Sequence, residues 1–189
     1  MSRLILEPSA TAAWHRVVTE AACQAQCELD EQRESYLVFL LMRYLRRPEL
    51  VRSVLALKFL QALLSHGQMR RESLQEVGDQ CLIFAGLFPE QAERRRVRLS
   101  YFVDLGRSAY GDLAGGPHAG SAELFHTLAC TFVVLTDVLR AIRQRGDSPA
   151  MTALQAAEFS LETDSTLARR VLRRYTRATL VAPGGHRRH

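Results

Sequence analysis

The chain has 189 residues, a formal net charge of +5, 47% hydrophobic residues and 24% charged residues, all ordinary values for a globular domain. It contains no uncharged apolar run of 18 residues, and the apolar stretch before Glu7 is only three residues long, so we expect neither a membrane-spanning helix nor a signal peptide. The four cysteines form no CxxC pair, which favours reduced thiols and a cytoplasmic protein over a secreted disulfide scaffold.

The positive charge is concentrated at the C-terminus. Residues 165–189 contain seven arginines and no acidic residue, whereas the other 164 residues sum to −2. Arginine supplies 24 of the 25 basic residues, the exception being Lys58. Such a ratio is typical of a GC-rich, bacterial-type genome, so the arginine count alone is weak evidence for nucleic-acid binding.

The spacing of apolar residues predicts helices along the whole chain. The run SYLVFLLMRYL is apolar nearly all round and indicates a buried helix. The next helix carries one apolar face, made of Leu50, Val54, Leu57, Leu60 or Gln61, and Leu64. Helices are expected over about 10–28, 31–46, 48–65, 71–87, 95–113, 122–144, 149–160 and 165–178, with a further start signal at Pro89.

Breaks between these helices are marked by glycine, proline and capping residues. GGPHAGS at 115–121 predicts a flexible loop, with Ser121 as the N-cap of the next helix. The segment TFVVLTDV is the only plausible strand, but its flanks keep helical spacing, so we expect a helix there. Gly146-Asp147-Ser148-Pro149 predicts a break with a cap and a first-turn proline.

Together these elements predict an all-α fold. We expect a single-domain bundle of about seven to eight helices over residues 1–180, followed by a disordered basic tail at 181–189. No repeat of 20–50 residues is visible.

The helix expected at 95–113 has the most informative pattern. Its apolar positions form a complete core stripe: Leu99, Phe102, Val103, Gly106, Ala109, Tyr110 and Leu113. Gly106 in mid-helix costs about 1 kcal/mol relative to alanine, which suggests close approach of a neighbouring helix or of a ligand. The opposite face offers candidate pocket residues, Tyr101, Asp104, Arg107 and Ser108. The alternative is an exposed face with one weak ion pair.

Motifs for metal binding and catalysis are sparse. Glu123 and His126 have the Glu-x-x-His spacing of di-iron bundles, but those proteins need it twice with two further glutamates, and Cys130 completes no four-ligand set. The alternative is that Glu123 is an acidic residue in the first turn of a helix and that His126 is an ordinary histidine. No nucleophile elbow, P-loop or dinucleotide fingerprint occurs, and we expect no cofactor.

The helix at 165–178 is basic and amphipathic. Its arginines fall on adjacent stripes: Arg169, Arg170, Arg173, Arg174 and Arg177. Such a face could track phosphates, bind an acidic protein surface such as the patch at 28–34, or simply be solvated. No helix-turn-helix fits, because the segment that would enter the groove is too apolar.

Three functions remain open from the sequence. The first is a non-enzymatic interaction or regulatory protein, for which the sequence suggests a homodimer through SYLVFLLMRYL. The second is nucleic-acid binding by the basic helix, in which changes at Arg170 and Arg174 would weaken binding to every sequence. The third is a helical-bundle enzyme or ligand binder with Tyr101, Asp104, Glu123 and His126 around one pocket.

Overall fold

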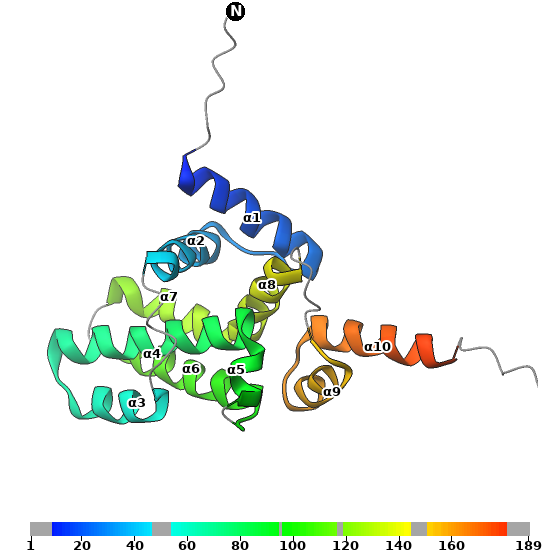
Figure 1. The fold of residues 1–189 in the computed structure, drawn as a ribbon. Helices are drawn as coiled ribbons and strands as arrows, with labels where there is room; N and C mark the ends of the chain where they lie inside the picture. The colour runs from blue at the N-terminus through cyan, green and yellow to red at the C-terminus, as the bar shows by residue number, and fades with distance from the viewer. Residues whose placement is uncertain (1–8, 47–53, 95, 117–118, 145–150, 181–189) are drawn as a thin grey trace, which may run out of the picture.

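The computed structural model describes residues 9–46, 54–94, 96–116, 119–144 and 151–180. Every regular element within these residues is an α-helix, and the helices form one bundle, so the predicted all-α bundle is confirmed (Figure 1). The tail expected at 181–189 lies outside the described residues. The helices are α1 (Ala10–Ala25), α2 (Glu31–Arg46), α3 (Leu55–Leu64), α4 (Gly67–Leu87), α5 (Pro89–Arg94), α6 (Leu99–Ala114), α7 (Ala119–Cys130), α8 (Phe132–Gln144), α9 (Ala153–Glu162) and α10 (Thr166–Leu180).

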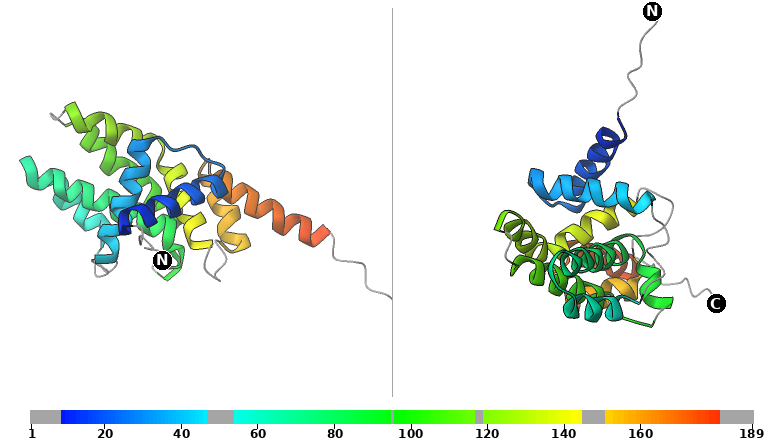
Figure 2. Two further views of the ribbon diagram at one scale, coloured as in Figure 1. Left: turned by 90° about the horizontal axis from the view of Figure 1, so that it is seen from above. Right: turned by 90° about the vertical axis from the view of Figure 1, so that its left-hand side faces the viewer.

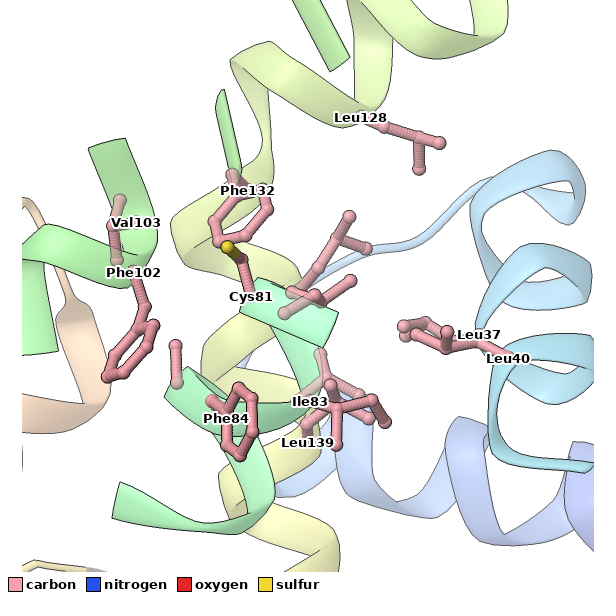
Figure 3. Close-up of a cluster of buried hydrophobic side chains, with 14 of the residues drawn as sticks. Leu37, Leu40, Cys81, Ile83, Phe84, Phe102, Val103, Leu128, Phe132 and Leu139 are labelled. Carbon is pink, nitrogen blue, oxygen red and sulfur yellow. The ribbon is translucent and has the colours of Figure 1, made fainter. Parts of the chain in front are cut away.

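Helix α4 lies at the centre of the bundle. Its residues from Val77 to Gly86 are all buried, and it packs against α3, α5, α6 and α8. Figure 3 shows Cys81, Ile83 and Phe84 of α4 among side chains of α2, α6, α7 and α8. A helix buried all round needs neighbours on every side, so the other helices are arranged about α4.

The remaining helices lie around α4 or at one end of the bundle. Figure 1 shows α2 on one side of α4 and α3 on the other, with α1 lying across α2 and α8. Helices α9 and α10 pack on each other at one end of the bundle, and the C-terminal part of α10 extends away from the body in both Figure 1 and Figure 2.

The helix expected over 122–144 is divided in two at Thr131. The axes of α7 and α8 differ by 69°. The Thr131 hydroxyl donates to the carbonyl oxygen of Thr127 at 2.7 Å, a local bond that competes with regular helix geometry and favours a bend. This break and the short helix α5 explain why the described residues contain more helices than expected. The plausible strand TFVVLTDV is helical, as predicted.

The predicted first residues of some helices agree with the structure, and those of others do not. Ser9 caps α1 by accepting from the Ala12 amide at 3.2 Å. The predicted cap for α7 is wrong, because α7 already begins at Ala119 and the Ser121 hydroxyl accepts from Arg71 instead. Helix α9 begins later than expected, with Thr152 in a capping box, and the predicted break at 146–149 lies outside the described residues.

Among the described helices, none is by itself long and apolar enough to cross a membrane. The bent pair α7–α8 reaches that length and apolar content only when its two halves are taken together. Its large apolar side chains, such as Phe125, Phe132 and Leu135, are buried in the bundle core.

Candidate functional site

A buried polar cluster surrounds Asp79 in the middle of α4. One carboxylate oxygen accepts from the hydroxyls of Tyr36 at 2.5 Å and Tyr110 at 2.8 Å, and the other accepts from Arg43 at 3.2 Å. Burial raises the pKa of the Asp79 carboxyl, and the two tyrosine hydrogen bonds oppose that rise. Gly78 provides room for the ring of Tyr110, because a Cβ there would lie 2.6 Å from its Cδ1. The cluster ties α2, α4 and α6 together, and Asp79 and Arg43 also line a small open pocket between α2 and α4 with Leu40, Tyr44 and Phe84.

The predicted core stripe of α6 is confirmed at all seven positions, which are all buried. Gly106 is the point of closest packing. A Cβ at this position would overlap the ring of Phe132 in α8 and lie 2.9 Å from Cβ of Cys81 in α4. Neighbouring helices therefore account for the glycine, and no ligand is needed to explain it.

The predicted pocket residues of α6 do not gather at one place. Asp104, Arg107 and Ser108 are exposed, while Tyr101 is half-buried with its ring 5.3 Å from that of Phe102. Asp104 and Arg107 line an open groove between α6, α8 and α9, which Tyr101 and Ser108 do not line. The groove is walled by Val103, Val133, Leu161 and several carboxylates.

The metal candidates Glu123 and His126 both lie exposed on α7. His126 contacts Cys130, with 3.7 Å between Nε2 and Sγ. Among the described residues no group of three or more histidine, cysteine or acidic side chains is placed to hold a metal ion. Neither candidate lines the groove that contains Asp104, so the structure does not join the four residues of the third hypothesis in one pocket.

The basic helix α10 is anchored at its start and carries exposed arginines. Asp137 of α8 accepts from the Ser165 hydroxyl at 2.6 Å and from the Leu167 amide at 3.2 Å, which fixes a carboxylate at the N-terminus of α10. Of the predicted arginines, Arg169, Arg173 and Arg174 are exposed, and Arg170 donates to the carbonyl of Gln24 at 2.8 Å. Arg177 lies on the same helix, outside the part whose side chains are described.

A second buried charge, Arg140 of α8, was not singled out by the sequence. It is fully buried, donates from Nε to the carbonyl oxygen of Ala85 at 2.9 Å, and lies 3.8 Å from the ring centre of Phe159. Burial lowers its pKa to about 10. Arg140 thus joins α8 to α4 and α9 and fills a structural role within the core.

Among the described residues, half of the large exposed apolar side chains lie on or directly before α3. We call this set the α3 face: Val54, Leu57, Leu60, Leu63 and Leu64, all exposed. Leu57 and Leu60 retain 57% and 55% of their accessible surface and Leu64 retains 79%. The opposite side of the helix, with Leu55 and Ala62 buried, packs against α4 and α6. Helix α3 is therefore apolar on both sides, but only one side is covered.

The run that we expected to mediate self-association lies largely inside the bundle. The run SYLVFLLMRYL forms α2, whose Leu37, Val38, Leu40 and Leu41 are buried within the same chain, leaving Phe39 as its large exposed apolar residue. The sequence signal for α3 was present in LALKFLQALL, where only Lys58 and Gln61 interrupt apolar residues. This pattern indicates a helix that is apolar all round and needs cover on both sides, whereas the spacing alone predicted one apolar face for it.

The comparisons with known proteins add no relative. No protein-family model matches this chain, and no curated protein and no solved structure matches it significantly.

Proposed function

We propose that this chain is a non-enzymatic, cytoplasmic helical protein that acts through protein–protein contacts made by the α3 face. The observation that carries the proposal is the exposure of four leucines and a valine on one side of a single helix. The largest contiguous apolar patch on a monomeric protein often marks an interaction site. All four cysteines are free of disulfides, which supports a reducing compartment.

The charge pattern of α3 also supports a protein partner. Lys58 is the only charged residue of the helix, and its Nζ is paired with Glu76 of α4 at 2.9 Å. No charge therefore interrupts the α3 face. Depletion of charge is characteristic of the central part of protein–protein interfaces.

A photo-reactive side chain placed on the α3 face provides the test. We expect benzoylphenylalanine at position 60 to give one discrete protein adduct in cells that produce the chain, because Leu60 is exposed at the centre of the face. The same residue at position 154 is the matched control, since Leu154 is also exposed but lies on α9. Electrophoresis and mass spectrometry of the adducts supply the readout.

The adduct must also depend on the rest of the face. Leu64→Glu introduces a charge one helical turn from position 60 and should abolish it. Equal labelling at positions 60 and 154, or no adduct at position 60, would overturn the proposed function.

A second candidate function is nucleic-acid binding by α10. It is favoured by the +7 charge of residues 165–189 and by the extension of α10, with its exposed arginines, away from the bundle (Figure 1). Each arginine that neutralises a phosphate would release a counterion, so binding would weaken steeply with salt.

The test of this candidate uses two exposed arginines. Arg173→Ala with Arg174→Ala should weaken binding to DNA or RNA of any sequence and lower the steepness of the salt dependence by about two charges. Arg16→Ala, at an exposed arginine of α1, is the control and should leave binding unchanged. Absence of gel retardation by the unmodified chain at low salt would rule this candidate out.

A further inference from the structure

We infer that the partner of the α3 face is a second copy of this chain, packed so that the two α3 helices run antiparallel about a two-fold axis close to residues 60 and 61. This inference rests on the proposed function and names the partner. It also replaces α2, predicted from the sequence, by α3 as the surface of a homodimer.

The spacing of the exposed leucines fits such an axis. Leu57, Leu60 and Leu64 are separated by three and four residues, which places them on one stripe of the helix. In an antiparallel pair whose axis lies near residue 60, Leu57 of one chain faces Leu64 of the other and the two Leu60 residues are adjacent. The face is thus complementary to itself, as a two-fold interface requires.

The exposed area of two α3 faces approaches that of a small specific interface. The α3 face exposes several hundred Å² per chain. Two such faces together approach the roughly 1,200 Å² at which specific interfaces begin. Met69, in the first turn of α4, is a further large apolar residue that is 70% exposed.

Electrostatics permits the pairing of identical surfaces. A charged residue near a two-fold axis meets its own copy and repels it, but the α3 face carries no charge and Lys58 points to Glu76. A second copy is also the one partner present in fixed proportion to the chain. Permanent cover of this kind suits a helix whose exposed side is as apolar as its buried side.

Sedimentation equilibrium of the purified full-length chain tests the inference. We expect twice the monomer mass at concentrations near 100 μM, and an increase of at least 30-fold in the dimer dissociation constant for Leu60→Glu. Leu154→Glu, the same change at a similarly exposed leucine of α9, should leave the constant unchanged. Circular dichroism establishes that each variant keeps its helical content.

A charge-swap experiment tests the two-fold axis itself. Leu60→Glu and Leu60→Arg chains should each be monomeric, while their equimolar mixture should dimerise, because position 60 meets position 60 of the second copy. A mixture that stays monomeric overturns the inference. A wild-type chain that is monomeric at 100 μM also overturns the inference. Binding of that monomer to anionic lipid vesicles would then identify a lipid surface, and not a second copy, as the partner of the α3 face.

The photo-adduct at position 60 separates failure of this inference from failure of the proposed function. A monomeric chain with an adduct to a different protein overturns the second copy as partner and leaves the protein contact intact. A monomeric chain without an adduct overturns both.

Discussion

Replacing Asp79 by alanine should destabilise the protein by about 3–5 kcal/mol, a large fraction of the stability of an ordinary domain. The change removes the acceptor of two tyrosine hydroxyls and of Arg43, all of which converge on this carboxylate from other helices. Groups buried without a partner bear their full desolvation cost. Chemical denaturation monitored by circular dichroism measures the loss.

The control for this prediction is Asp112→Ala in α6. Asp112 pairs with Arg70 at 3.5 Å in a partly exposed position, and such pairs contribute about 1 kcal/mol or less. A loss at Asp79 no larger than the loss at Asp112 would show that the buried cluster does not hold α2, α4 and α6 together.

Asp79→Asn isolates the pH dependence of the same cluster. Because burial raises the pKa of Asp79 in the folded protein above its value in the unfolded chain, the folded state holds the proton to a higher pH. The contribution of this carboxyl to stability is therefore complete below the unfolded pKa and is lost as pH rises through the folded pKa. Asparagine does not titrate, so its stability deficit relative to wild type should shrink as the pH rises above about 4, the ordinary pKa of an aspartate. A deficit that grows over this range would contradict a raised pKa.

The Asp79 cluster also illustrates what the sequence could not reveal. Helical spacing over 71–87 predicts one apolar stripe with Leu74, Val77, Cys81, Phe84 and Leu87 or Phe88, of which the first four are buried and Leu87 and Phe88 are partly buried. Asp79 lies off this stripe, where a charged residue normally indicates the solvent side of a helix. It is buried because Tyr36 and Tyr110, 43 and 31 residues away, supply its hydrogen bonds, and no local pattern encodes that pairing.

Local periodicity predicted well those helices that have a single apolar side. The seven-residue stripe of α6 follows from spacing alone, because polar residues on the other face fix which side turns inward. Helix α3 carries apolar residues on both sides, so no polar face indicates which side turns inward. Spacing placed Val54, Leu57, Leu60 and Leu64 together on one face, yet could not indicate whether the bundle covers this face or the one with Leu55 and Ala62.

The candidate sites were less predictable than the fold, since a site depends on which faces meet. Asp104 and Glu123 lie on different helices, and only the bend at Thr131 and the packing of α9 decide whether they share a cavity. The exposure of the α3 face, on which the proposed function depends, likewise results from how the other helices pack. Such information is absent from any single helix.

Gly106→Ala should lower the stability by about 2 kcal/mol, and the unfolding temperature by about 4–8 °C for a chain of this size. A methyl group in this position overlaps the Phe132 ring and approaches Cβ of Cys81 at 2.9 Å, and both neighbours are buried. Overpacking of this kind costs up to about 3 kcal/mol, from which the better helix propensity of alanine recovers about 1 kcal/mol. Thermal and chemical denaturation provide the two measurements.

Gly111→Ala in the same helix is the matched control and should have the opposite sign. A Cβ at Gly111 meets nothing within 4 Å, so the change is expected to add up to about 1 kcal/mol of stability through helix propensity alone. If both substitutions stabilise the protein, the packing explanation for Gly106 is wrong.

A double substitution then identifies the neighbour responsible. Phe132→Leu shortens the side chain that occupies the space beside Gly106, so Gly106→Ala should cost at least about 1 kcal/mol less in that background than in wild type. Such coupling would assign the mid-helix glycine to the contact between α6 and α8. Because the buried side of α6 would then be fully accounted for by packing, any ligand contact of this helix would have to involve its exposed side, where Asp104 and Arg107 line the groove beside α9. Additive effects of the two substitutions would instead leave Cys81 of α4 as the neighbour that requires a glycine.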